Sequence, residues 1–361
     1  MLYALLYPLS DQVSAFNVFR YITFRAAGAT VTALLLSLLL GPGLIRLLRR
    51  RSLGQNIRDV GPASHQVKAG TPTMGGLLIL TALALSTLLW ASLGNVYVWL
   101  CLGTTLAFGA VGFADDYLKI LRRRNLGLSA RSKLLLQVAA AAVFGALLWA
   151  LPKAFGFEPT LAFPFFKRLV LTLGLLYIPF VVLVLVGASN AVNLTDGLDG
   201  LAMGATLVAA GTYAVFTYVA GNSVASTYLQ VPYVPGAGEL TVFCGAMVGS
   251  ALGFLWFNAH PAEVFMGDVG SLAIGGAIGA VAVVAKQELV LLLVGGLFVL
   301  EALSVIVQVA SFKLTGKRVL RMAPLHHHFE LVGWAEPKII VRFWILALLF
   351  ALLSLSTLKL R

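Results

Sequence analysis

Ten apolar stretches, each about 17–25 residues long, constrain the fold of this chain more than any other feature. A stretch of that length crosses the hydrocarbon core of a bilayer, about 30 Å thick, as an α-helix. Because backbone groups in lipid must satisfy one another, helices are expected in place of open strands. The sequence therefore predicts an all-α polytopic membrane protein, with spans near 22–45, 74–93, 96–114, 134–151, 169–187, 200–219, 240–257, 270–286, 289–312 and 338–358.

Composition supports the same class. Of the 361 residues, 60% are hydrophobic and 11% are charged, whereas soluble domains carry about 25% charged residues. These values exclude a soluble enzyme of this size and a disordered chain. The longest connection, 46–73, is too short for a core of its own, so we expect one integral membrane domain over 1–361 with no separate soluble domain.

Basic residues are unevenly divided between the two sets of connections that ten spans create. Connections 46–73, 115–133, 188–199, 258–269 and 313–338 carry seventeen Lys and Arg, whereas the opposite side, which includes both termini, carries eight. Because cytoplasmic connections are enriched in Lys and Arg, we predict that the first set faces the cytoplasm and both termini face the periplasm. The formal charge of +12 then reflects topology and anionic substrates, and no nucleic-acid partner is expected.

Asp115 and Asp116 are adjacent at the cytoplasmic end of the third predicted span. Two neighbouring carboxylates repel each other, so either one is protonated or a cation lies between them. Mg²⁺ is the expected cation, because it prefers oxygen ligands and commonly joins one or two carboxylates to substrate phosphates. The alternative is a solvated helix end paired with Lys119 and Arg122.

Segment 190–201 repeats polar residues every third position, which places them on one helical face. Its Asn190, Asn193, Asp196 and Asp199 have side chains that can hold a nucleobase edge or a sugar hydroxyl. One aspartate could cap the following helix, but a single cap leaves the other Asp and both Asn unexplained. We therefore interpret this segment as substrate-binding.

The polar connection 258–271 supplies further candidates, beginning with Asn258. Asp268 lies between Gly267 and Gly270 and can approach a metal or a phosphate closely. Phe265 is a candidate platform for stacking a base, although a single interfacial aromatic is more often an anchor.

The consecutive histidines His326, His327 and His328 do not predict a zinc site. Neighbouring side chains diverge by about 100° on a helix, and no cysteine lies nearby to complete a tetrahedral ligand set. We expect the three to bind phosphate or an acidic substrate group. An interfacial histidine patch is the alternative.

A glycine-rich, cationic segment covers 64–76. Thr71 as N-cap and Pro72 at the first helical position predict a helix start there. Lys68 beside that helix N-terminus predicts a site for an anion.

Together these segments resemble the bacterial phospho-N-acetylmuramoyl-pentapeptide transferase family over essentially the whole chain. The wider superfamily of polyprenyl-phosphate sugar-1-phosphate transferases shares the aspartate pair and the NLTDGLDG-like stretch. In this chain the last position of its aspartate-rich motif is Lys119, so a third carboxylate would have to come from Asp268. The resemblance rests on GTPTMGG at 70–76, Asp115–Asp116, NAVNLTDGLDGLA at 190–202, FMGDVGS at 265–271 and PLHHHFE at 324–330.

The resemblance implies a Mg²⁺-dependent transferase in the bacterial inner membrane, with its active site facing the cytoplasm. Its substrates would be undecaprenyl phosphate and UDP-N-acetylmuramoyl-pentapeptide. Its products would be UMP and the first lipid intermediate of peptidoglycan, which links it to cell wall biogenesis, cell shape and cell division. The family also suggests a homodimer surrounded by membrane lipids.

The resemblance implies roles for individual residues as well. Asp268 would be the principal Mg²⁺ ligand, and Asp115 and Asp116 would help to hold the metal or activate the lipid phosphate. Uridine would contact Asn193, Asp196 and Phe265. Phosphates would contact Lys68 and the three histidines, and the remaining substrate-binding candidates are Lys119, Asn190, Asp199 and Asn258.

Two other functions are compatible with the sequence. A related transferase would pass N-acetylglucosamine-1-phosphate to the same lipid, although the triple histidine favours the muramoyl branch. A lipid or solute transporter would bury ionisable groups near the bilayer midplane, where Glu301 alone offers support. A direct attack and a two-step route through an aspartyl-phosphate both remain open.

Overall fold

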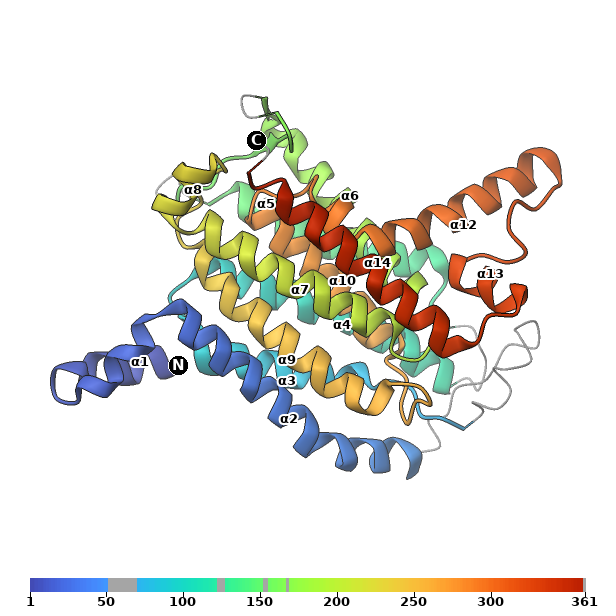
Figure 1. The fold of residues 1–361 in the computed structure, drawn as a ribbon, viewed down its shortest axis with the longest axis horizontal. Coiled ribbons are helices and arrows are strands. Elements are labelled where there is room, and N and C mark those ends of the chain that lie inside the picture. Colours follow the sequence, from blue (N-terminus) through green and yellow to red (C-terminus); the bar gives the residue numbers. More distant parts are fainter. Residues whose placement is uncertain (51–69, 122–126, 152–154, 167–168, 360–361) are drawn as a thin grey trace.

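A computed structural model describes residues 1–50, 70–121, 127–151, 155–166 and 169–359 as a bundle of helices (Figure 1). Short 3₁₀ helices cover Tyr7–Asp11, Ser14–Arg20, Gly174–Leu176 and Ala237–Glu239. The α-helices are α1 (Leu2–Leu6), α2 (Ile22–Arg50), α3 (Gly76–Trp90), α4 (Val96–Leu121), α5 (Ala130–Trp149), α6 (Tyr177–Thr195), α7 (Leu201–Ala220), α8 (Ser223–Leu229), α9 (Leu240–Asn258), α10 (Gly267–Val284), α11 (Leu291–Val294), α12 (Gly296–Thr315), α13 (Leu325–Val332) and α14 (Glu336–Ser356).

Nine helices in the described part of the chain are long and apolar enough to cross a membrane. The remaining predicted span, 74–93, corresponds to α3, whose fifteen residues reach about 22 Å at 1.5 Å per residue. That length is less than the roughly 30 Å of a hydrocarbon core. The prediction of an all-α polytopic membrane protein is confirmed.

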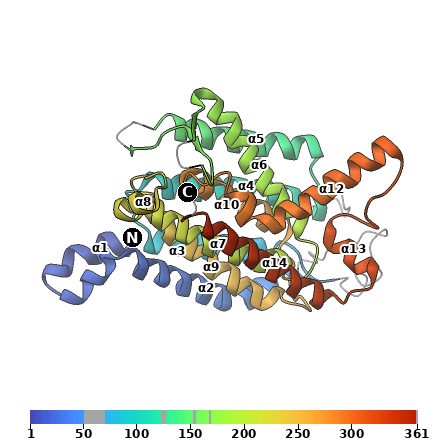
Figure 2. The ribbon, with the colours of Figure 1, turned by 45° about the horizontal axis from the view of Figure 1, so that its top comes forward.

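Helix α10 occupies the centre of the bundle, and 16 of its 18 residues are buried. It packs against α3, α4, α6 and α7, and Figure 2 shows it enclosed between neighbouring helices. Glycines allow these close contacts: a Cβ built on Gly275 would lie 2.5 Å from Cα of Ser189 on α6. Small residues at helix contacts are the usual means of close packing in membranes.

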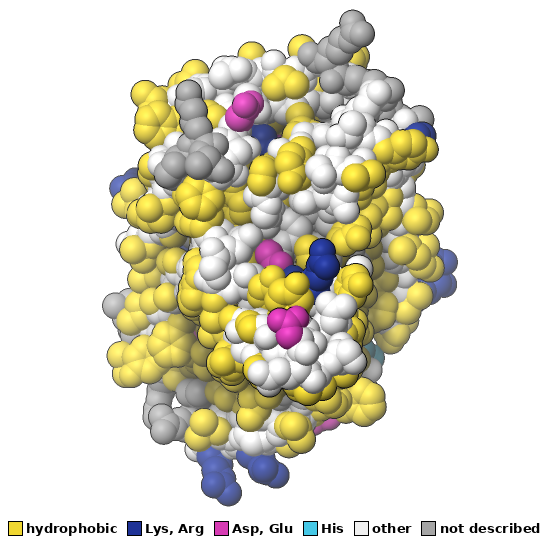
Figure 3. Space-filling view, turned by 90° about the vertical axis from the view of Figure 1, so that its left-hand side faces the viewer, with side chains coloured by type: hydrophobic (Ala, Val, Ile, Leu, Met, Phe, Trp, Pro, Cys, Tyr) yellow, Lys and Arg dark blue, Asp and Glu magenta, His cyan; other side chains and the backbone are white. Residues whose placement is uncertain are grey.

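Both termini lie at one end of the bundle, at the left in Figure 1, and α13 lies at the other end. Figure 3 views the end that carries the termini, where hydrophobic side chains surround a few charged ones. Next to this end, β1 (Thr160–Ala162) pairs antiparallel with β2 (Val170–Thr172). The two termini therefore lie at the same end of the bundle.

Several helix boundaries differ from the predicted ones. The expected span 169–187 is replaced by α6, which begins at Tyr177 because 170–172 pairs with β1. The expected span 289–312 is divided into α11 and α12 at Gly295 and Gly296. Helix α4 continues past its expected end at 114 to Leu121, which places Asp115 and Asp116 inside its last two turns.

Candidate active site

Three carboxylates meet where α4 ends and α10 begins. Asp115 and Asp116 come from α4 and Asp268 from α10, and one oxygen of each lies within 4.8 Å of the others. The two helices come this close because Gly112 has no side chain: a Cβ there would lie 2.1 Å from the carbonyl oxygen of Asp268. The backbone N–H of Val269 donates to Asp116 Oδ2 over 3.1 Å, which fixes that carboxylate to the start of α10. We call Asp115, Asp116 and Asp268 the acidic cluster.

Two lysines lie within ion-pair distance of the acidic cluster. Lys119 Nζ is 2.6 Å from both Asp115 Oδ2 and Asp268 Oδ2 and 3.3 Å from Asp116 Oδ1. Lys133 Nζ, from α5, is 2.8 Å from Asp268 Oδ2. Among the described residues, three carboxylates therefore meet two ammonium groups at this point. The pairing of Asp115 and Asp116 with Lys119 follows the alternative expected from sequence, but Asp268 and Lys133 make the cluster larger than a solvated helix end.

Asn193 orients the third carboxylate. Its Nδ2 donates to Asp268 Oδ1 over 2.6 Å and to Ser271 Oγ over 2.7 Å. Both donors of the side-chain amide are thus engaged within the protein. The structure places Asn193 as a support for Asp268, a contact that its spacing in the sequence did not indicate.

Asp196 follows α6 directly and is partly buried beside the cluster. Burial raises the pKa of Asp196 to about 8, and the negative charges of Asp268 and Asp116 act in the same direction. This shift favours the protonated form of the carboxyl group, which can donate a hydrogen bond to a substrate oxygen.

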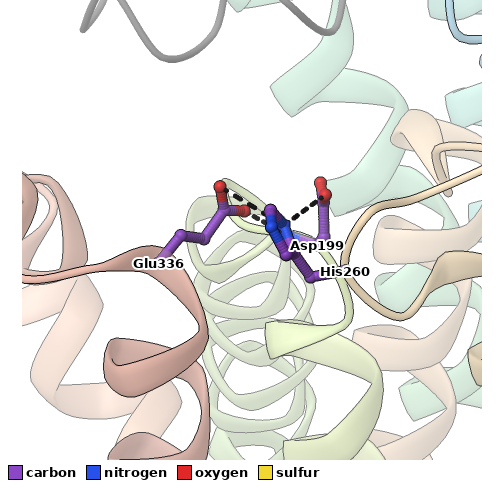
Figure 4. Close-up of side chains that lie close together, drawn as sticks. All are labelled: Asp199, His260 and Glu336. Carbon is purple, nitrogen blue, oxygen red and sulfur yellow. Dashed lines mark hydrogen bonds and ion pairs between the residues drawn. The ribbon is translucent and has the colours of Figure 1, made fainter.

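Asp199 belongs to a second group, shown in Figure 4, with His260 and Glu336. Asp199 Oδ2 accepts from Ala262 N and lies 3.1 Å from His260 Nδ1. Glu336 Oε1 accepts from Asp199 N over 3.1 Å. These contacts join the α6–α7 turn, the α9–α10 connection and the start of α14.

Sequence reasoning gave no role to His260 and did not consider Glu336. His260 lies in a segment already recognised as polar, so its proximity to Asp199 needed only the fold. Glu336 is 137 residues from Asp199, and no local pattern connects the two.

Two predicted substrate-binding asparagines contact protein groups. Asn190 Nδ2 donates to Gln137 Oε1 over 2.7 Å and so joins α6 to α5. Asn258 is buried; its Oδ1 accepts from Gly200 N and its Nδ2 donates to the carbonyl of Val264. Both side chains position the segments that carry the site.

The glycine-rich segment reaches the site through its backbone. Phe265 N donates to the carbonyl of Pro72 over 2.8 Å, and Gly75 N donates to the carbonyl of Phe265 over 2.9 Å. The predicted helix start at Thr71–Pro72 is therefore wrong: this backbone pairing keeps the segment extended, and α3 begins at Gly76. The side chain of Phe265 is half-buried. Lys68 lies outside the described residues.

The three histidines lie on α13, and each has its own partner. His326 is fully buried, with Nδ1 3.2 Å from Glu301 Oε1. His327 Nδ1 lies 2.6 Å from Glu330 Oε2, and His328 Nδ1 accepts from Arg321 N over 3.2 Å. Each of the three rings therefore contacts a different protein group.

The donor chemistry of the acidic cluster fits a hard divalent cation. Its donors are carboxylate oxygens, which suit Mg²⁺ and do not favour softer metals. The Asp199 group adds an imidazole nitrogen and differs in that respect. A helical membrane protein with clustered carboxylates and lysines has the features of an enzyme that handles phosphate-bearing substrates.

Comparison with known proteins identifies the family. The profile of glycosyl transferase family 4 matches residues 98–286, and signature 1 of phospho-N-acetylmuramoyl-pentapeptide-transferase matches residues 68–80. Proteins named phospho-N-acetylmuramoyl-pentapeptide-transferase from Geobacter sp. (strain M21) and Citrifermentans bemidjiense are each 59% identical to this chain over 361 residues. A protein of the same name from Desulfosudis oleivorans is 59% identical over 362 residues, and every one of these matches covers both chains completely. The chain belongs to the phospho-N-acetylmuramoyl-pentapeptide-transferase family and is a transferase.

Proposed function

We propose that this chain transfers phospho-N-acetylmuramoyl-pentapeptide from its UDP-linked donor to undecaprenyl phosphate. An oxygen of the lipid phosphate forms a bond to the sugar-side phosphorus, the bond from that phosphorus to the UMP phosphate breaks, and UMP leaves. One pyrophosphate bond replaces another, so no other energy source is needed. The observation that carries the proposal is the acidic cluster with Lys119 and Lys133 between its carboxylates.

The residues of the acidic cluster would hold Mg²⁺, with Asp268 as the principal ligand and Asp115 and Asp116 beside it. Bound there, the metal would neutralise charge on the phosphates of the donor and the lipid. Lys119 and Lys133 are close enough to Asp268 to exchange an ion pair with a carboxylate for one with a substrate phosphate. The protonated carboxyl of Asp196 would donate to the donor nucleotide, with Phe265 against the uracil ring.

Release of UMP by purified protein in detergent tests the reaction and its donor. We expect Mg²⁺-dependent release with UDP-N-acetylmuramoyl-pentapeptide and none with UDP-N-acetylglucosamine; the reverse preference would assign the chain to the related transferase. Asp268→Asn is expected to reduce turnover by at least about 100-fold. Glu263→Gln is the matched control, because Glu263 is an exposed carboxylate in the same connection.

Phosphorylated enzyme distinguishes the two chemical routes. If the donor is incubated with enzyme in the absence of lipid, an aspartyl-phosphate accumulates only on the two-step route. We favour direct attack, because Asp115, Asp116 and Asp268 are each engaged with Lys119. Recovery of a phosphorylated aspartate from that incubation would contradict this choice.

We further propose that the acidic cluster faces the cytoplasm and that the protein forms a homodimer in the inner membrane. The seventeen-to-eight distribution of basic residues supports this orientation. In whole cells, Lys317→Cys should resist a membrane-impermeant maleimide and Asn222→Cys should react. Native mass spectrometry in detergent should give twice the chain mass of 38.4 kDa.

A further inference from the structure

A pocket of about 530 Å³ lies outside the bundle, beside the C-terminal half of α12. This half of α12 extends away from the other helices, and the chain then returns through connection 316–324 to α13 (Figures 1 and 2). The pocket is formed by α12, the returning connection and Leu331 of α13. None of its lining residues belongs to the acidic cluster or to the Asp199 group.

The pocket is held open by hydrogen bonds between α12 and the connection. Gln308 Oε1 accepts from the backbone N–H groups of Val319 and Leu320 over 3.0 and 2.9 Å. Gln308 Nε2 donates to the carbonyl of Leu320 over 2.9 Å. The pocket therefore exists before any ligand binds, which reduces the entropy lost on binding.

One wall of the pocket is apolar and continues onto the surface of α12. Val305, Val309 and Phe312 line it from α12. Val309 and Phe312 are also among the exposed hydrophobic side chains of that helix. An apolar wall continuous with an exposed apolar helix face suits a hydrocarbon chain that leaves the pocket along the helix.

The rim of the pocket is cationic. Lys313, Arg318 and Arg321 contribute to its lining, and all three are exposed. Arg321 Nη1 donates to the carbonyl of Leu331 over 2.6 Å, which fixes its guanidinium beside α13. Within the described ranges, none of the three has a carboxylate at ion-pair distance. Three cations next to an apolar wall complement a molecule with a phosphate at one end and hydrocarbon at the other.

We propose that this pocket binds one anionic phospholipid. Its phosphate would contact Lys313, Arg318 and Arg321, and an acyl chain would follow Val305 and Phe312 along α12. Basic pockets at the membrane surface bind acidic headgroups in this way, and the volume lies within the range of ligand pockets, about 300–1,000 Å³. Polyprenyl phosphate is the less suitable occupant, because a substrate must bring its phosphate to the acidic cluster, which contributes nothing to this lining.

The connection that forms the pocket leads directly into α13, which carries His326, His327 and His328. A phospholipid held between α12 and this connection would stabilise the approach to α13. The inference does not depend on the proposed reaction, since lipid binding can be measured without turnover.

Native mass spectrometry of the full chain in neutral detergent tests the proposal with phosphatidylglycerol and phosphatidylcholine as probes. We expect phosphatidylglycerol to bind and phosphatidylcholine to bind at least tenfold more weakly. The double variant Lys313→Gln, Arg318→Gln should weaken the binding of phosphatidylglycerol by about 30-fold, because each lost charge lowers the affinity roughly fivefold. Arg49→Gln, Arg50→Gln is the matched control, because it removes two exposed charges from the end of α2 and should change binding less than twofold.

Val305→Trp distinguishes binding in the pocket from general electrostatic binding at the protein surface, because it fills the pocket and retains every charge. We expect it to abolish phosphatidylglycerol binding while UMP release stays at the wild-type rate, which shows that the variant is folded. Equal losses in the two charge variants, or wild-type binding by Val305→Trp, would overturn the proposal. Displacement of phosphatidylglycerol by equimolar undecaprenyl phosphate would also overturn it, because the pocket would then belong to the substrate lipid.

Discussion

Gly112 controls whether the acidic cluster can assemble. A Cβ at this position would lie 2.1 Å from the carbonyl oxygen of Asp268 and 2.7 Å from the backbone nitrogen of Val269. Real Cβ contacts are essentially never shorter than 3.0 Å, so Gly112→Ala must separate α4 from α10 by at least about 0.9 Å. Because the obstacle is backbone, no rotamer change can relieve it.

We expect this separation to affect catalysis more than folding. A displacement of about 1 Å in a catalytic arrangement can cost about 100-fold in rate, whereas overpacking of a core costs about 1–3 kcal/mol. Gly112→Ala moves Asp115 and Asp116 away from Asp268, and all three are needed on the proposed reaction. We therefore predict that Mg²⁺-dependent UMP release falls by about 100-fold in protein that still purifies as a folded species.

Gly103→Ala is the matched control for this measurement. It introduces the same methyl group into the same helix, and within the described part of the chain no atom of another element lies within 4 Å of its Cβ. Alanine also favours the helix over glycine by about 1 kcal/mol. Turnover of the Gly103 variant should equal that of the wild type, and its thermal stability should be equal or higher. If the two variants released UMP at rates within twofold of each other, the close contact would not control the site.

Three further predictions concern groups around the site and the opposite end of the bundle. Asn193→Ala should raise the Mg²⁺ concentration for half-maximal UMP release by about tenfold or more, because Asp268 loses a hydrogen bond that orients its carboxylate. Asn190→Ala should leave this concentration unchanged, because the Asn190 side chain bonds Gln137 and not Asp268. The pKa of Asp196 is raised from 3.8 to about 8, so the free energy of unfolding falls as the pH rises between these values. In EDTA, the melting temperature of Asp196→Asn should therefore exceed that of the wild type at pH 9. At pH 4 the two melting temperatures should be equal. Arg25→Met should destabilise the protein by about 3–5 kcal/mol, because Glu239 loses two 2.6 Å hydrogen bonds from the buried guanidinium. The double variant Arg25→Met, Glu239→Leu should regain most of this stability, as measured by thermal unfolding.

The all-α class and the approximate positions of the membrane-spanning helices followed from the sequence because apolar length is a local property. The ends of the helices did not, because a partner outside the helix decides them. Residues 170–172 are apolar enough to begin a span, yet they pair with β1, and α6 begins at Tyr177. Thr71 and Pro72 have the residue types of a helix start, yet their segment pairs with the backbone at Phe265 and Met266.

The candidate site shows the same difference between what local sequence predicts and what distant contacts decide. Asp115, Asp116 and Asp268 were recognisable because carboxylates are scarce and costly at the ends of apolar spans. The contacts that orient them were not recognisable, because Asn193 and Lys133 reach Asp268 from helices 75 and 135 residues away. Residue type and spacing alone did not predict the contacts of Asp199. Its spacing in segment 190–201 suggested substrate binding, whereas in the structure it contacts His260 and Glu336.

Glu301 decides how much support the transporter interpretation retains. In the sequence it is an isolated acid inside an apolar span, the position expected of an ion-coupling group. In the structure it is fully buried; its Oε2 accepts from Leu325 N over 2.7 Å, and its Oε1 lies 3.2 Å from His326 Nδ1. Both contacts belong to the start of α13, so the charge is used to attach that helix to α12. An ion pathway would need the carboxylate to face a neighbouring membrane helix or a cavity. Glu301 instead attaches α12 to α13, so the sequence feature that favoured transport is explained by helix packing.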